Sequence, residues 1–114
     1  MKLYLNGSEV TSFDTDNRAN YAQNTDYGIN SNVKHNIGSN QAGGNFGHYY
    51  ISEVNFVDGT AYDASYFGET KNGVWIPIKY TGSYGTQGFH LEFKQTGDGS
   101  STASSTTIGA DTAN

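Results

Sequence analysis

The chain alternates short apolar stretches with clusters of turn-forming residues, a pattern typical of an all-β protein. A first strand over residues 2–5 alternates apolar and polar positions, and Asn6-Gly7 follows it directly. An Asn-Gly pair readily supplies the two positive φ angles of a type I′ turn. We therefore predict a hairpin whose second strand covers residues 8–13.

Residues 48–57 are the strongest strand candidate, but their apolar positions do not keep one phase. Tyr49 and Ile51 fall on one face of a strand, whereas Val54 and Phe56 fall on the other. A β-bulge near residues 52–53 would bring all four side chains to one core. The alternative is a central strand that is covered on both faces.

Further strands are predicted on either side of this segment. Residues 14–32 form a long polar loop, and residues 33–38 form a short strand. Residues 73–80 form a strand that Pro77 restricts to a sheet edge or a bulge, because proline lacks an amide donor. We expect residues 89–93 to pair with it as a hairpin.

One helical turn is predicted over residues 63–68. Asp63 is a favourable N-cap, and Gly68 would end the turn in a left-handed conformation. The C-terminal stretch differs in composition from the residues before it. Residues 96–114 are rich in Ser, Thr and Gly and contain one large apolar residue. We expect a β domain over residues 1–95 and a flexible tail or linker over residues 96–114.

Composition narrows the class of protein further. Hydrophobic residues make up only 34% of the 114 residues, but aromatic residues make up 14%, so aromatic rings must supply much of the core. The absence of cysteine excludes disulfides and thiol chemistry. A net charge of −5 argues against a nucleic-acid partner. No apolar run approaches the roughly 18 residues of a membrane span, so we expect no membrane insertion.

The carboxylates do not suggest an enzyme. Glycosidases need two carboxyl groups about 5–10 Å apart in a cleft. Glu53 and Glu92 lie in predicted strands, while Asp58, Asp63 and Glu69 surround one turn, and no spacing pairs two of them as acid and base. We therefore expect a protein without catalytic activity.

A metal site is conceivable in the long polar loop. Asp14 and Asp16 lie two residues apart, and Asp26 lies in the same loop. Oxygen ligands on a loop suit Ca²⁺, although the twelve-residue pattern of an EF-hand is absent. The alternative is a solvated acidic turn with no metal.

Several stretches resemble one known family. Residues 3–13 (LYLNGSEVTSF) resemble the late hairpin of laminin-G-like, concanavalin A-like jelly-roll domains, and residues 36–38 resemble the short strand that follows it. Residues 48–59 (HYYISEVNFVDG) resemble the closing strand of that fold. Residues 67–93 (FGETKNGVWIPIKYTGSYGTQGFHLEF) closely resemble a segment that follows the jelly roll in structural and tail proteins of tailed bacteriophages.

The resemblance implies a partial or shortened jelly-roll sandwich with a C-terminal β-hairpin extension over residues 67–93. The chain corresponds to the second half of that fold, so we expect either a fragment or a shortened domain. An open half-sandwich exposes strand edges and an apolar face. We therefore expect a homo-oligomer or a strand-completing partner. Calcium at the sandwich rim is common in laminin-G-like domains, which favours the loop site.

The resemblance also implies a function. Carbohydrate binding is the family's usual mode of recognition, with aromatic rings against the sugar and amides and carboxylates on its hydroxyls. The candidate residues are Trp75, Tyr80, Tyr84, Arg18 and Tyr21. Among them we expect Trp75 to lie mainly in the core and Tyr84, in a glycine-rich loop, to be exposed.

We thus expect a non-enzymatic virion component of a tailed phage that contacts other virion proteins. The favoured role is a tail or fibre-associated module that recognises host-surface glycans. The alternative is a capsid decoration or fibre-assembly protein without a ligand site. A polysaccharide depolymerase is the third and weakest hypothesis.

Overall fold

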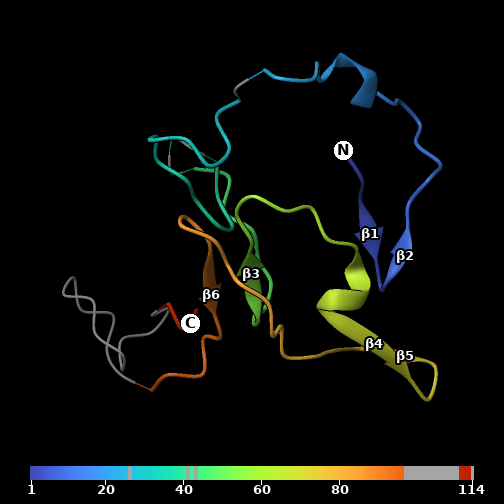
Figure 1. The fold of residues 1–114 in the computed structure, drawn as a ribbon, viewed down its shortest axis with the longest axis vertical. Helices are drawn as coiled ribbons and strands as arrows, with labels where there is room; N and C mark the ends of the chain where they lie inside the picture. The colour runs from blue at the N-terminus through green and yellow to red at the C-terminus, as the bar shows by residue number, and fades with distance from the viewer. Residues whose placement is uncertain (26, 41, 43, 97–110, 114) are drawn as a thin grey trace. The chain divides into compact units, whose positions relative to one another are not determined.

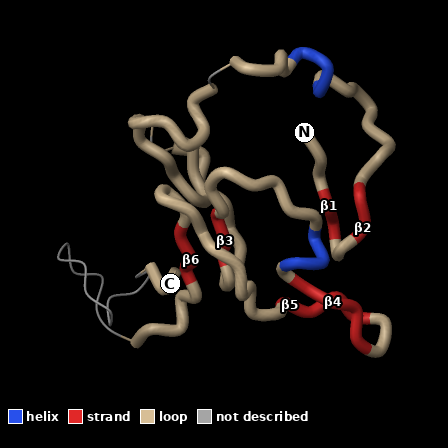
Figure 2. The backbone as a smooth tube through the Cα atoms, in the orientation of Figure 1, coloured by secondary structure: helices blue, strands red, loops and turns tan. Residues whose placement is uncertain are grey.

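The computed structural model describes residues 1–25, 27–40, 42, 44–96 and 111–113. In this part of the chain the regular structure is mainly β: three two-stranded antiparallel sheets and two 3-10 helices, with no α-helix (Figures 1 and 2). The predicted β class is confirmed at this level. Contacts divide the chain into two compact units. Unit 1 comprises Met1–Asp26 and Gly59–Gly82, and unit 2 comprises Tyr27–Asp58 and Ser83–Asn114.

The N-terminal hairpin of unit 1 forms as predicted, with shorter strands. Strands β1 (Tyr4–Leu5) and β2 (Ser8–Glu9) pair in antiparallel register. Between them Asn6 and Gly7 have φ angles of 48° and 80°, as a type I′ turn requires. This turn type matches the natural twist of the two strands and sets their register locally.

A second hairpin in unit 1 corrects the predicted strand pairing. Strand β5 (Val74–Pro77) pairs with β4 (Gly68–Lys71), not with residues 89–93. The reason is local, because Asn72 and Gly73 have φ angles of 52° and 79° and form a second Asn-Gly turn. Pro77 is the last residue of β5, and the sheet has only two strands. Its missing amide donor therefore breaks no hydrogen bond to a third strand.

The predicted helical turn is present as the 3-10 helix η2 (Ala64–Tyr66). Asp63 is its N-cap, and its side chain accepts a hydrogen bond from the Ser65 amide at 2.9 Å. The predicted left-handed terminator is wrong. The turn ends at Phe67, whose φ is −120°, and Gly68 begins β4 without a positive φ.

Unit 2 is built on one long-range strand pair. Strand β3 (Val54–Phe56) lies beside β6 (Phe89–Leu91) and antiparallel to it (Figure 1). Asn55 is opposite His90 in the register. The strand predicted over 48–57 is therefore much shorter. Its interruption falls where the apolar pattern changes phase, since Glu53 has a positive φ of 55°. This residue turns the backbone just before β3, so no regular bulge forms.

The predicted strand over residues 33–38 is absent, because local polar contacts replace strand pairing there. The Val33 amide donates to the Ser31 carbonyl oxygen at 2.7 Å, and Gly38 has a φ of 83°. The predicted loop 14–32 contains the 3-10 helix η1 (Arg18–Asn20). In the predicted tail 96–114, residues 97–110 and 114 lie outside the described residues. Asp111 forms a bridge with Leu91 of β6.

Each unit buries aromatic rings, as the composition predicts. In unit 1, Tyr80 is 5% exposed, and its ring centroid lies 5.2 Å from that of Phe67 and 5.7 Å from that of Tyr62. In unit 2, Tyr84 is 5% exposed and stacks on His90. Few aliphatic residues are available, so two tyrosines take the positions that leucine or valine would otherwise fill.

Many other large apolar side chains are exposed. In unit 2 they are concentrated in the segment before β3: Tyr27, Ile29, Val33, Ile37, Phe46, Tyr49, Tyr50 and Ile51. Within the described parts of the chain, no helix is long and apolar enough to cross a membrane.

Candidate functional site

Unit 2 contains a cleft of about 800 Å³, bounded by the β3–β6 pair and the asparagine-rich segment that precedes it. This volume lies within the roughly 300–1,000 Å³ range of small-molecule sites. Seven polar and five apolar residues line it: Asn30, Ser31, Asn32, His35, Asn36, Asn55 and Gln87, with Ile29, Ile37, Val54, Phe56 and Phe89. None of these lining residues is Asp, Glu, Lys or Arg, so the cleft offers neutral hydrogen-bonding groups.

An aromatic pair provides the rigid part of the lining. Phe56 of β3 and Phe89 of β6 are directly opposite in the strand register. Their ring centroids are 5.3 Å apart and their planes differ by 14°, which is a stacked arrangement. Because the two strands hold both rings, the cleft presents a preformed apolar surface.

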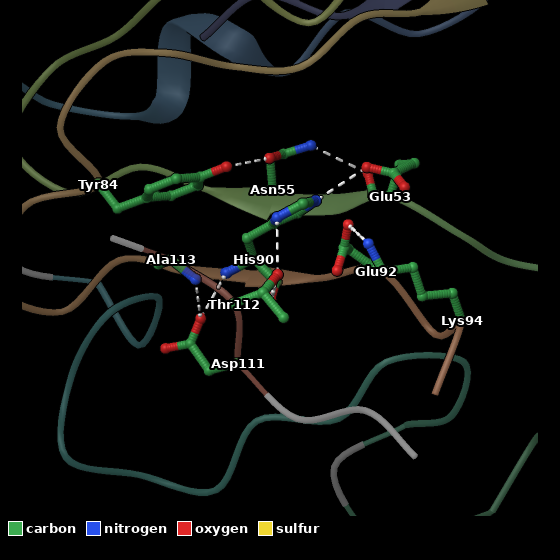
Figure 3. Close-up of polar contacts among 9 residues, drawn as sticks. All are labelled: Glu53, Asn55, Tyr84, His90, Glu92, Lys94, Asp111, Thr112 and Ala113. Atoms are coloured by element: carbon green, nitrogen blue, oxygen red, sulfur yellow. Dashed lines mark hydrogen bonds and ion pairs between the residues drawn. The ribbon is translucent and has the colours of Figure 1, made fainter. Parts of the chain in front are cut away.

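Asn55, which precedes Phe56 in β3 and lies opposite His90, has an oriented amide. Its Oδ1 accepts a hydrogen bond from the Tyr84 hydroxyl at 2.6 Å, and its Nδ2 donates to the Glu53 carbonyl oxygen at 3.1 Å (Figure 3). The pKa of Tyr84 is raised, first by burial and then by the charges of Glu53, Asp111 and Glu92. The phenol is therefore a donor across the physiological pH range, and the Asn55 orientation is fixed.

The segment that forms the other side of the cleft is held through Asp58. One carboxylate oxygen accepts a hydrogen bond from Asn30 Nδ2 at 2.9 Å, and the other accepts one from the backbone amide of Gln87 at 3.3 Å. The Asp58 amide in turn donates to the Tyr84 carbonyl oxygen at 2.9 Å. His35 Nε2 and the Ser31 hydroxyl both bond the Gly28 carbonyl oxygen, at 3.0 and 2.7 Å. The polar lining is thus partly preorganised.

A second polar network lies around His90 (Figure 3). Its Nε2 donates to Glu53 Oε2 at 2.8 Å, and its Nδ1 lies 2.9 Å from the Thr112 hydroxyl. Asp111 Oδ1 accepts from the amides of His90 and Ala113, both at 2.9 Å. The network connects residues 111–113 to β6 and holds the His90 ring that stacks on Tyr84.

The series of hydroxyl, imidazole and carboxylate in this network has the order found in hydrolases. Here we interpret the network as a structural contact that holds residues 111–113 against β6. His90 is only 9% exposed and is stacked against Tyr84, with ring centroids 5.9 Å apart. The Thr112 hydroxyl donates a hydrogen bond to the His90 carbonyl oxygen at 3.2 Å. This bond orients the hydroxyl toward the backbone of β6.

The predicted carbohydrate residues are divided between the two units. Tyr84 belongs to unit 2, whereas Trp75, Tyr80, Arg18 and Tyr21 belong to unit 1. The predicted exposure of Tyr84 is wrong, because the ring stacks on His90 and the hydroxyl bonds Asn55. Trp75 is half-buried in β5, and Tyr80 is buried. Arg18 opens η1, and the exposed Tyr21 follows that helix.

The acidic loop residues are placed as follows. Both carboxylate oxygens of Asp16 accept hydrogen bonds from the Arg18 guanidinium, at 2.7 to 3.1 Å. These bonds lower the pKa of Asp16 to about 2. Asp14 is exposed, and Asp26 lies outside the described residues. The described residues contain no group of three His, Cys, Asp or Glu side chains that could hold a metal, and the calcium site stays a prediction.

The cleft residues themselves were not predicted. The available signal was the density of asparagine between residues 30 and 36 (NSNVKHN), in a segment interpreted as loop and strand. The contribution of Phe89 required the pairing of β3 with β6, which joins positions more than thirty residues apart. No protein-family model matches the chain, and no curated protein or solved structure shows significant similarity to it.

Proposed function

We propose that this protein binds carbohydrate in the cleft of unit 2. The observation that carries the proposal is the stacked pair of Phe56 and Phe89 in a cleft otherwise rich in neutral amides. Sugars place their C–H faces against aromatic rings and exchange hydrogen bonds with amides through their hydroxyls. A lining without Asp, Glu, Lys or Arg favours a neutral polyhydroxylated ligand over an anion or a cation.

The biological setting that we propose is the virion of a tailed bacteriophage, with a host-surface glycan as the ligand. The support is the resemblance of residues 67–93 to phage tail and structural proteins. We further propose that the fold is a shortened concanavalin A-like jelly roll. The antiparallel pairing of all three small sheets is compatible with that fold.

A structural role in the virion is the second candidate, and one observation favours it. Eight large apolar side chains are exposed between Tyr27 and Ile51. Exposed apolar groups at this density mark interaction surfaces in soluble proteins. They support contacts with other virion proteins or with further copies of this chain, either beside a glycan site or without one.

The test of carbohydrate binding uses two side chains that line the cleft and are exposed. Asn32→Ala and Gln87→Ala remove one amide each without altering the backbone bond of Gln87 to Asp58. Each should weaken binding to a responsive bacterial surface polysaccharide by about fivefold, in line with the loss of one hydrogen bond. Isothermal titration calorimetry after a polysaccharide array screen provides the measurement.

Gln23→Ala is the matched control, because Gln23 is exposed in unit 1 and does not line the cleft. Its affinity should equal that of the wild type. Equal affinity of all three variants for a bound polysaccharide would reject the cleft as the site. Failure of the whole array to bind would favour the structural role.

A further inference from the structure

Unit 1 contains a second hollow, of about 290 Å³, that the proposed glycan cleft does not involve. It lies where the β1–β2 turn, η2 and β5 meet. Four aromatic residues line it, namely Tyr4, Tyr62, Phe67 and Trp75, together with the carboxylate residue Asp63. Half of the residues that line this hollow are aromatic, compared with 14% of the whole chain.

The rings of this hollow are held in place by their surroundings. A Cβ atom added to Gly7 or Gly68 would overlap the indole of Trp75, so the indole lies directly against both backbones. Tyr62 and Phe67 each pack against the buried ring of Tyr80, with centroids 5.7 and 5.2 Å away. The aromatic lining is therefore preformed and does not depend on a ligand to arrange it.

One negative charge accompanies the rings. Asp63 caps η2, and both bonds from Ser65, from its amide at 2.9 Å and from its hydroxyl at 2.6 Å, reach the same oxygen, Oδ1. These bonds lower the pKa of Asp63, so its carboxylate is ionised at neutral pH. The Lys2 ammonium also acts on Asp63, but it is paired with Glu9 at 3.0 Å. None of the residues that line the hollow is Lys or Arg.

We infer that this aromatic hollow binds a quaternary ammonium group, such as the trimethylammonium end of a choline-type ligand. Aromatic faces carry negative potential and attract cations whose methyl groups spread the charge and weaken hydration. A carboxylate at the rim adds long-range attraction. A quaternary ammonium matches both the rings and the charge, whereas a neutral group of the same shape matches the rings alone.

The experiment uses Trp75, which is the single tryptophan of the chain and therefore a direct fluorescence reporter of this hollow. Choline chloride is titrated into the full chain at constant ionic strength, with sodium chloride as the salt control. The neutral isostere 3,3-dimethyl-1-butanol has the same shape without the charge. Choline should give a saturable change in Trp75 emission, with an affinity about tenfold above that of the isostere.

A charge-neutral variant completes the test. Asp63→Asn retains an oxygen that can cap η2 and removes only the charge, so it should lower choline affinity about fivefold. Glu69→Gln, at an exposed position of β4 outside the hollow, is the matched control and should leave the affinity unchanged. A titration with Nε-trimethyl-lysine distinguishes the source of the ammonium group. Tighter binding than choline would indicate a methylated protein, and weaker binding a choline-bearing glycan or lipid.

Two results would overturn the inference. One is the absence of a saturable response to both ammonium compounds in the wild-type chain. The other is equal affinity for choline and its neutral isostere, because the hollow would then be an unspecific apolar gap. Both comparisons use the wild-type protein, so they remain valid even if Asp63→Asn disturbs the fold.

Discussion

The hydroxyl of Tyr84 donates a 2.6 Å hydrogen bond to Oδ1 of Asn55, and this bond connects the buried layer of unit 2 to its cleft. Tyr84 is the buried partner, and Asn55 is the residue that lines the cleft. Tyr84, which the sequence predicts to be exposed to ligand, is therefore buried and holds the side chain of Asn55.

Tyr84→Phe tests this connection. Phenylalanine retains the ring against His90 but leaves Oδ1 of Asn55 unpaired in a part-buried position. We expect a loss of about 1–2 kcal/mol in the free energy of unfolding, measured by urea denaturation. If polysaccharide binding is confirmed, its affinity should fall as well, because Asn55 loses its orientation. An unchanged free energy of unfolding would show that the bond contributes nothing.

The two Asn-Gly turns allow backbone strain to be separated from side-chain overlap. Gly7 and Gly73 have φ angles of 80° and 79°, but a Cβ would meet the Trp75 ring only at Gly7. Gly73→Ala should cost about 1–2 kcal/mol through the unfavourable φ alone. Gly7→Ala should cost about 1–3 kcal/mol more, because the indole must move. Equal losses in urea denaturation would contradict the packing of Trp75 on the first hairpin.

The ion pair of Asp16 and Arg18 makes a prediction about pH. Hydrogen bonds from Arg18 lower the pKa of Asp16 from 3.8 to about 2 in the folded chain. The stabilising contribution is therefore present above pH 3.8 and is lost as the pH falls toward 2. An NMR titration of the Asp16 carboxyl carbon should give the low pKa, and Arg18→Gln should return it toward 3.8. A normal pKa in the wild type would contradict the ion pair.

Thr112 provides a test of the anchor between residues 111–113 and β6. Its amide donates to the His90 carbonyl oxygen at 2.8 Å, and its hydroxyl lies beside His90 Nδ1. Thr112→Val removes the hydroxyl at similar size and should weaken the anchor by about 1 kcal/mol. Hydrogen exchange at the residue 112 amide should accelerate accordingly, about fivefold. Thr112→Ser should restore protection, and its failure to do so would assign the effect to packing.

Local features of the fold could be predicted from sequence, and long-range features could not. The Asn6-Gly7 turn and the Asp63 cap depend on residues next to each other, and both are confirmed. The same rule applied at Asn72-Gly73 gives the β4–β5 hairpin, but the stronger apolar pattern of residues 89–93 led to the wrong partner. Neighbouring strands joined by a tight turn pair with little loss of chain entropy.

The candidate site was harder to predict for a related reason. Aromatic residues serve both as core and as recognition surface in a chain with few aliphatic residues, and composition cannot separate these roles. The glycines around Tyr84 predict an exposed loop, yet Gly85 and Gly88 allow the backbone to approach Asp58 and Tyr84 closely. Those glycines indicate tight packing around Tyr84 and not an exposed loop tip.

The most direct test of the central claim is an NMR titration of the isotope-labelled chain with the polysaccharide selected by the array. The account predicts saturable shifts in the side-chain amide signals of Asn32 and Gln87 and in the backbone signals of Asn55 and Phe89, because all four residues line the cleft. Signals of β4 and β5, in unit 1, should stay unchanged. Shifts confined to unit 1, or no saturable shift in the cleft residues, would contradict the proposed carbohydrate site.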